Sequence, residues 1–137
     1  MDIRITANVS EEDTKEILSE LRKFNLSKRE PSEDVPIGIF LEDDKGVKQA
    51  GLIGETFGNW LCIKYLWVSE ELRGKGIGSS IIEAAEKEAA RRKCKYVFVD
   101  TFSFQAPDFY RKHGYKEVFT LNEYPYTGSR HYYTKEL

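Results

Sequence analysis

A glycine-rich stretch with two basic residues, ELRGKGIGSSII at residues 71–82, is the part of the sequence best suited to chemistry. An apolar pattern typical of a helix follows it directly. The N-terminus of a helix presents unpaired N–H groups and a partial positive charge, and glycines let a ligand approach the backbone. The stretch therefore predicts a site for phosphate groups. Its defining residues are Arg73, Gly74, Lys75, Gly76 and Gly78.

Two common phosphate-binding patterns do not fit these glycines. The nucleotide triphosphate loop requires G-x-x-x-x-G-K-[ST], and no Gly-Lys-Ser/Thr occurs in that register. The dinucleotide pattern G-x-G-x-x-G would require glycine at the position of Ser79. Considered by itself, the stretch could therefore also be a tight structural turn without a ligand.

The sequence on both sides of the glycines is more specific. LWVSEELRGKGIGSSIIEAAEKEA resembles the acyl-coenzyme A motif of the GNAT N-acetyltransferases, [QR]-x-x-G-x-[GA], with Arg73, Gly76 and Gly78 at its defined positions. Downstream, APDFYRKHGY resembles the second motif of that family, a short helix that carries Phe-Tyr and ends in glycine followed by an aromatic residue. The resemblance is sharp over residues 66–115 and weaker over the N-terminal half.

The resemblance implies how the cosubstrate acetyl-coenzyme A would bind. Its pyrophosphate would lie on the backbone N–H groups of residues 73–79, and its pantetheine arm would pair like an extra strand with residues 66–68. The family commonly has asparagine three residues before the alanine of the second motif, and Ser103 stands there in this chain. The cofactor-binding residues so implied are Leu66, Trp67, Val68, Arg73, Gly74, Lys75, Gly76, Ile77, Gly78, Ser79 and Ser103.

The implied reaction is direct attack of an amine on the acetyl thioester. The backbone N–H of Val68 is the candidate that polarises the carbonyl, and Tyr110 occupies the family position of the acid that protonates the leaving thiolate. An alkylamine with a pKa near 10.4 is almost fully protonated at neutral pH, so a base would help. Glu55, near the end of a predicted strand, is the first candidate for the base, Asp100 is the second, and water alone is the third. Tyr110 could instead fill the core, and either carboxylate could be solvated or ion-paired.

Aromatic residues gather around a predicted turn in EYPYTGSRHYY, residues 123–133. They could form one wall of an acceptor pocket, although packing between strands explains them equally well. Acidic residues such as Glu33 and Asp34 favour a small cationic amine as the acceptor. A polyamine, an aminoglycoside-like compound, an amino acid and a protein amine all stay open. The candidate acceptor-binding residues are Tyr124, Tyr126, His131 and Tyr133.

The composition narrows the classes of function. The 137 residues carry a formal net charge of −2, which lacks the basic excess of a nucleic-acid-binding protein. Two cysteines give no disulfide framework, and two histidines far apart give no metal-ligand spacing, so no metal is expected. The N-terminus does not resemble a signal peptide, and no stretch approaches the roughly 20 apolar residues of a membrane span. We expect a cytoplasmic protein without nucleic-acid or membrane partners.

These residues need a scaffold, and hydrophobic periodicity predicts the order βαβββαβαββ. A strand is expected at residues 2–8, and a helix is expected to begin at Ser10, where Asp13 completes an approximate capping box. Residues 60–69 are apolar on both faces, as expected of a central strand. The remaining strands are expected at residues 37–44, 48–57, 95–102, 115–124 and 130–137, with helices after residue 76 and at residues 106–113.

We therefore expect an α/β (mixed α+β) protein with one GNAT domain over residues 1–137. Its central, mostly antiparallel twisted sheet should be splayed at the acyl-coenzyme A slot and flanked by helices. The predicted activity is acetyl-coenzyme A-dependent N-acetylation of a small-molecule amine. The alternative is a coenzyme A-binding sensor or interaction domain without turnover, and the presence of Tyr110 favours the enzyme. A homodimer is expected because it is common in the family.

Overall fold

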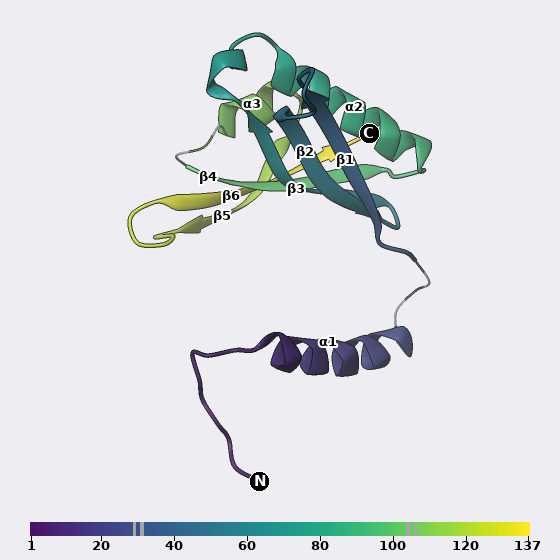
Figure 1. The fold of residues 1–137 in the computed structure, drawn as a ribbon, viewed down its shortest axis with the longest axis vertical. Helices are drawn as coiled ribbons and strands as arrows, with labels where there is room; N and C mark the ends of the chain where they lie inside the picture. Colours follow the sequence, from purple (N-terminus) through teal and green to yellow (C-terminus); the bar gives the residue numbers. More distant parts are fainter. Residues whose placement is uncertain (29, 31, 104, 106) are drawn as a thin grey trace. The chain divides into compact units, whose positions relative to one another are not determined.

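The computed structural model describes residues 1–28, 30, 32–103, 105 and 107–137. Contacts divide the chain into two compact units, residues 1–32 and residues 33–137. The first unit contains α1 (Glu11–Leu26), and the second contains the sheet and the remaining helices (Figure 1). None of the helices in the described residues is long and apolar enough to cross a membrane.

The first unit confirms one local prediction and contradicts another. Ser10 caps α1: its hydroxyl accepts the N–H of Asp13 at 3.0 Å, and the Asp13 carboxylate accepts the N–H of Ser10 at 3.1 Å. The strand predicted at residues 2–8 is wrong, because the described residues there form no strand. A polar and apolar alternation makes a strand only when a neighbouring strand pairs with its backbone.

The second unit is built on one mixed sheet in the order β1-β2-β3-β4-β6-β5. All neighbours pair antiparallel except β3 and β4, which pair parallel. The predicted mixed, mostly antiparallel sheet is thereby confirmed. The strands are β1 (Val35–Glu42), β2 (Lys48–Phe57), β3 (Trp60–Val68), β4 (Tyr96–Phe102), β5 (Lys116–Asn122) and β6 (Ser129–Glu136).

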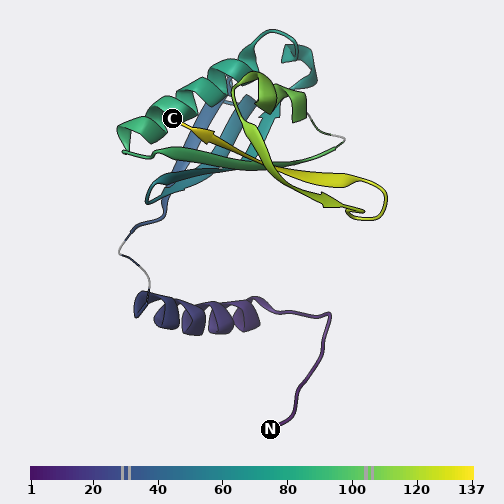
Figure 2. The ribbon, with the colours of Figure 1, turned by 180° about the vertical axis from the view of Figure 1, so that it is seen from behind.

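Helices cover one face of this sheet (Figures 1 and 2). A short 3₁₀ turn, η1 (Glu70–Leu72), leads from β3 towards α2 (Ile77–Arg91), and α3 (Pro107–Lys112) follows β4. The helix α2 packs against β1, β2 and β3, and α3 packs against β5. The helix expected after residue 76 is thereby confirmed, and its residues Ile81, Ile82, Ala85 and Ala89 lie in the core.

The opposite face of the sheet, which we call the open face, carries Glu55, Trp60, Cys62, Tyr65 and Phe98. Along β3, Leu61 and Ile63 point to the helices and are buried, whereas Trp60 and Tyr65 are 40% and 69% exposed. Residues 60–69 form a central strand as expected, since β3 lies between β2 and β4, and within the second unit α2 and α3 cover one of its two faces. Each strand therefore buries only alternate residues.

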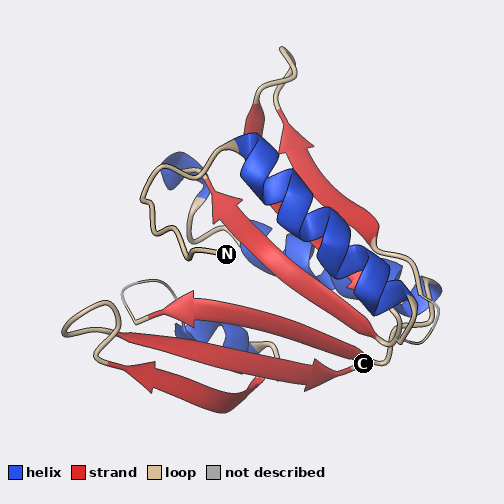
Figure 3. Cartoon of the chain, turned by 90° about the horizontal axis from the view of Figure 1, so that it is seen from below, coloured by secondary structure: helices blue, strands red, loops and turns tan. Residues whose placement is uncertain are grey.

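The sheet is splayed between β3 and β4, as expected. The two strands pair only from Trp60–Tyr96 to Ile63–Val99, and beyond that point residues 64–68 and 100–102 diverge. We call this gap in pairing the strand opening. Seen from below, two groups of strands spread apart from a common end near the C-terminus (Figure 3).

A β-bulge lies where the strand opening begins. Ile53 pairs with Tyr65 and the next residue of β2, Gly54, pairs with Ile63, so Lys64 is an extra residue in β3. A bulge bends its strand and increases the local twist, and bulges are frequent beside active sites. Gly54 is needed at this point because an added Cβ would overlap the carbonyl oxygen of Cys62.

Candidate active site

The glycine turn, residues 73–79, connects η1 to the first turn of α2. Gly74 and Gly76 have φ of +76° and +79°, and a Cβ added to either would meet no atom within 4 Å. Glycine is therefore needed at these two positions for the positive φ of the backbone, and not because neighbouring atoms leave too little space for a side chain. Gly78 differs: its added Cβ would lie 3.4 Å from Phe109 and 3.7 Å from Val68, so its small size keeps α2 close to α3 and β3.

The start of α2 can hold an anion. Gly76 is the N-cap and has no side chain to cap the helix, and the first bond of the helix runs from the Ser80 N–H to the Gly76 carbonyl at 3.1 Å. The N–H groups of the first helical residues, 77–79, have no partner within the helix. These donors, the open space at the glycines and the exposed Lys75 fit the pyrophosphate of coenzyme A.

The end of β3 fits the arm of the same cosubstrate. Beyond Ile63 this strand has lost its pairing with β4, so its edge at residues 66–68 is free to pair with an extended ligand. The Arg73 Nε donates to the Val68 carbonyl at 3.2 Å, which ties the glycine turn to the end of β3. The structure thus brings together the cofactor residues predicted in β3 and in the turn.

Two of the predicted cofactor residues, Ser79 and Ser103, use their hydroxyl groups in contacts within the protein. The Ser79 hydroxyl lies 2.9 Å from the His113 Nε2 at the end of α3, which leaves the backbone N–H of Ser79 as its ligand-binding group. Ser103 pairs with Ser129 at the start of β6: its N–H donates to the Ser129 carbonyl at 2.9 Å, and its hydroxyl accepts the Ser129 N–H at 3.3 Å.

Tyr110 is buried on α3, with 8% of its surface exposed. Its ring packs edge-on against Tyr115 and parallel to Tyr133, at centroid distances of 5.7 and 6.0 Å. Burial, with a smaller contribution from the charge of Asp100, raises the pKa of Tyr110 to about 12. This lies well above the roughly 8.5 of an ordinary thiol, so complete transfer of the proton to a thiolate is uphill. The hydroxyl is suited instead to donating a hydrogen bond to a leaving sulfur.

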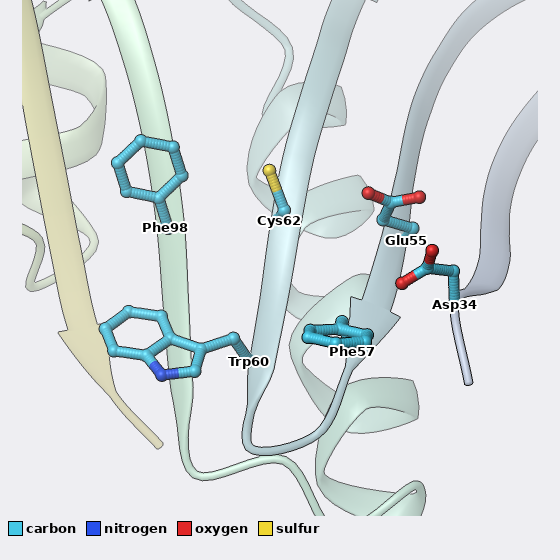
Figure 4. A pocket seen from close by; sticks show the side chains of 6 residues that line it. All are labelled: Asp34, Glu55, Phe57, Trp60, Cys62 and Phe98. Carbon is cyan, nitrogen blue, oxygen red and sulfur yellow. The ribbon is translucent and has the colours of Figure 1, made fainter. Parts of the chain in front are cut away.

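A pocket of about 490 Å³ opens on the open face of the sheet. Trp60 and Phe98 lie on one side and Glu55 on the other, with Cys62 between them (Figure 4). Its size falls in the range of small-molecule sites. We call it the acidic pocket; its lining residues are Asp34, Glu55, Phe57, Trp60, Cys62 and Phe98.

Glu55 connects the acidic pocket to the strand opening. Its carboxylate lies 3.3 Å from the Nζ of Lys64, the bulge residue, and both side chains are partly exposed. It also pairs across β2 and β3 with Cys62, whose thiol pKa is raised by burial and, to a smaller extent, by the Glu55 charge. A carboxylate beside a bulge at the mouth of the opening can take a proton from an amine directly or through water.

Asp100, the second candidate base, is held by Arg130. The Arg130 Nε donates to the Asp100 carboxylate at 2.7 Å, and its NH1 donates to the Tyr124 hydroxyl at 3.2 Å. This contact raises the pKa of the Arg130 guanidinium. Asp100 does not line the acidic pocket.

The predicted acceptor-binding residues do not form one wall. Tyr124 lies against Arg130, and Tyr126 is 85% exposed in the loop before β6. His131 and Tyr133 point to the helix-covered face, where His131 contacts Glu117 and Tyr133 is fully buried. His131 and Tyr133 share a face because they are two residues apart in β6, whereas Tyr124 and Tyr126 lie between β5 and β6.

Glu55 is the predicted site residue in the acidic pocket, and Asp34 was expected only to favour a cationic acceptor; the other lining residues were not predicted. The signal that could have found them is the turn at Gly58 and Asn59, which makes β2 and β3 a hairpin and sets Phe57 opposite Trp60. Period-two alternation then places Cys62 on the same face as Trp60.

Comparisons with known proteins agree with this geometry. The family model described as "Acetyltransferase (GNAT) domain" matches residues 36–117. An acetyltransferase of Agrobacterium fabrum is 31% identical over 107 residues, 78% of each chain. The blasticidin-S acetyltransferase of Streptomyces morookaense is 37% identical over 95 residues, 69% of this chain and 70% of its own.

A solved structure extends the agreement to the fold. An acetyltransferase from Bacillus cereus is 29% identical, and the match covers 98% of both chains with a TM-score of 0.84. The family match includes the strand opening, the glycine turn, Tyr110 and all the lining residues of the acidic pocket except Asp34. The chain therefore belongs to the GNAT family and is an acetyltransferase.

Proposed function

We propose that this protein transfers an acetyl group from acetyl-coenzyme A to a primary amine of a small cationic molecule. The observation that carries the proposal is the order of three features along β3. The acidic pocket lies at its start, the strand opening begins at its bulge, and the glycine turn follows its end. This order suits an acceptor and a donor that approach one reaction centre from two directions.

The chain has a group for each step of the transfer. The backbone N–H of Val68 polarises the acetyl carbonyl, and the Tyr110 hydroxyl donates a hydrogen bond to the departing sulfur. Glu55 takes the proton of the attacking amine, directly or through water, and Asp100 is the second candidate for this role. Pocket geometry favours Glu55, because it lines the acidic pocket whereas Asp100 is paired with Arg130.

Two observations support a small cationic acceptor. The acidic pocket carries the carboxylates of Asp34 and Glu55, and its volume suits a small molecule. By its name, the relative from Streptomyces morookaense is an acetyltransferase of blasticidin S. Tyr124, Tyr126, His131 and Tyr133 stay predictions for acceptor contacts, as do the homodimer and the cytoplasmic location.

The first test measures binding of the donor. Acetyl-coenzyme A at about 100 times its dissociation constant adds roughly 2.7 kcal/mol to the free energy of unfolding, which corresponds to a rise in Tm of about 5–15 °C. NAD and ATP should give much smaller shifts. Equal shifts with NAD or ATP would overturn the assignment of the glycine turn to coenzyme A.

The second test measures turnover. Thiol release from acetyl-coenzyme A is followed with small cationic amines, uncharged amines and peptides that carry a free amino group. Faster release with small cationic amines is expected. Release that is fastest with peptides would favour a protein acceptor, and binding without release by any amine would favour the non-catalytic alternative.

A further inference from the structure

The acidic pocket has walls of two chemical kinds (Figure 4). Phe57, Trp60 and Phe98 supply aromatic rings, and Asp34 and Glu55 supply carboxylates. Ring faces attract cations through their quadrupole, and carboxylates attract them through charge. None of the six lining side chains carries a positive charge. The pocket is therefore complementary to an ammonium or a guanidinium group.

Two of the rings, those of Phe57 and Trp60, lie at the end of the pocket that is remote from the strand opening, whereas Phe98 pairs with Cys62. Trp60 is the first residue of β3 that pairs with β4 and Ile63 is the last, so the opening begins three residues after Trp60. A strand rises about 3.3 Å per residue, which places these two points about 10 Å apart. Phe57 pairs directly with Trp60 and shares its end of the pocket, whereas Glu55 pairs with Cys62, nearer the opening. A cation against the rings is therefore a different group from one that enters the opening.

The two carboxylates of the pocket also differ in their partners. Glu55 already has a cation beside it, since the Lys64 Nζ lies 3.3 Å from its carboxylate. Asp34 makes no ion pair with any of the residues that the structure describes. A permanent cation of the ligand is therefore attracted more strongly towards Asp34 than towards Glu55.

We propose that the ring end of the acidic pocket binds a second cationic group of the acceptor, an ammonium or guanidinium that lies about 10 Å or more from the amine that is acetylated, since the strand opening begins at that distance and continues towards Val68. This inference rests on the proposed function, because the reacting amine must lie at the strand opening. Trp60 and Phe57 contact the cation through their rings, and Asp34 supplies the countercharge. The substrate class is then a dication rather than any amine with one positive charge.

Binding is tested first, in the absence of acetyl-coenzyme A. Tetramethylammonium, which has no N–H to acetylate, should slow the alkylation of Cys62 by iodoacetamide, because Cys62 lines the same pocket. Uncharged tert-butyl alcohol, and sodium chloride at equal concentration, should not. Mass spectrometry of the Cys62 peptide distinguishes this thiol from the buried Cys94, which serves as an internal control.

Variants assign the protection to the ring end. Trp60→Leu and Asp34→Asn should each remove protection by tetramethylammonium. Tyr65→Leu is the matched control, since Tyr65 is an exposed aromatic residue on the open face of the same strand but outside the pocket. Protection that survives in both Trp60→Leu and Asp34→Asn would overturn the proposed position of the cation.

Turnover tests the spacing. The value of kcat/KM for an α,ω-diamine is compared with that for the monoamine of the same chain length. The preference for the diamine should rise with chain length to about 2- to 30-fold, the range of one cation–π contact, and fall towards one in Trp60→Leu. Equal rates for diamines and monoamines, with no protection of Cys62, would overturn this inference and leave the proposed function standing. Absence of turnover with every amine would overturn the proposed function instead, and Cys62 protection then decides alone whether the pocket binds cations.

Discussion

Tyr110 illustrates how burial limits what a single side chain can do in a reaction. Its ring is enclosed by Tyr115, Tyr133 and Phe109, and the low polarity of this site disfavours the phenolate. The hydroxyl therefore stays protonated throughout the ordinary pH range and is always ready to donate a hydrogen bond. A donor of this kind stabilises charge that develops in the transition state, with little effect on the ground state.

We expect Tyr110→Phe to lower kcat by roughly 10²-fold, the low end for loss of one hydrogen-bond donor to the transition state, with little change in the affinity for acetyl-coenzyme A. Tyr115→Phe is the control, because Tyr115 is also buried but its hydroxyl donates to Glu86 at 3.1 Å. That variant should lose stability and keep its kcat. The measurements are steady-state kinetics with a good amine and the dissociation constant of the donor. A kcat near that of the wild type in Tyr110→Phe would return Tyr110 to a packing role.

Glu55→Gln keeps the shape of the side chain and removes the carboxylate. If Glu55 is the base, kcat/KM should fall most on the acid side of the pH profile, where more of the amine is protonated. Asp100→Asn is the comparison, because that carboxylate is held by Arg130 outside the acidic pocket. A Glu55→Gln profile parallel to that of the wild type, and within about twofold of it, would exclude Glu55 and leave Asp100 or water.

At the scale of elements, the turn before α2 allows two roles of glycine to be tested apart: a backbone conformation with positive φ and access of a ligand to the backbone. Gly76 and Gly46, in the turn between β1 and β2, have nearly the same φ, +79° and +78°, and neither has an atom within 4 Å of an added Cβ. The two positions therefore impose the same backbone requirement in equally open space. They differ in that only Gly76 lies at the start of α2.

Gly76→Ala and Gly46→Ala should each destabilise the protein by about 1–2 kcal/mol, the strain of a left-handed L-residue. Only Gly76→Ala should also weaken coenzyme A binding, by about tenfold or more, because its Cβ occupies the space where the pyrophosphate meets the backbone. Chemical denaturation and calorimetric titration measure the two effects. Equal affinity for coenzyme A in both variants would mean that the phosphates bind elsewhere.

Elements with local signals could be predicted from the sequence. The capping box of Ser10 and Asp13 set the start of α1, and the apolar pattern after the glycine turn predicted α2. The strand expected at residues 2–8 failed because its pattern alone cannot supply a pairing strand. The acidic pocket could not be predicted because it depends on the register that sets Phe57 opposite Trp60, a property of two strands together.

For the molecule as a whole, the buried tyrosines make stability sensitive to high pH. The pKa of Tyr110 is about 12 in the folded protein and about 10 when unfolded, so the unfolded chain releases its proton first as the pH rises. The stabilisation is complete below pH 10 and is lost as the pH rises towards 12. The pKa of Tyr115 is raised in the same direction by burial and by Glu86.

Between pH 10 and pH 12, Tyr110 alone should lower the free energy of unfolding by about 2.7 kcal/mol, from 1.36 kcal/mol for each of two pH units. Tyr110→Phe should therefore show a shallower loss of stability over this range than the wild type. Urea denaturation at several alkaline pH values measures the difference. Identical slopes for the two proteins would mean that the Tyr110 hydroxyl ionises as readily when folded as when unfolded.

Lys64 has a consequence for chain length. Ile53–Tyr65 and Gly54–Ile63 are successive pairs between β2 and β3. Removal of Lys64 would therefore leave all the remaining side chains of β3 on their present faces. We expect a variant that lacks Lys64 to keep its core. Its straightened β3 should pair with β4 along residues 65–68 and 100–102, since the extra residue is what bends the strand.

Hydrogen exchange at residues 66–68 should then be slower than in the wild type, and coenzyme A should no longer raise the Tm. Exchange as fast as in the wild type would mean that the strand opening does not depend on the bulge at Lys64. A sheet of this kind gains or loses an opening for a cosubstrate through one codon, without any change in the composition of its core.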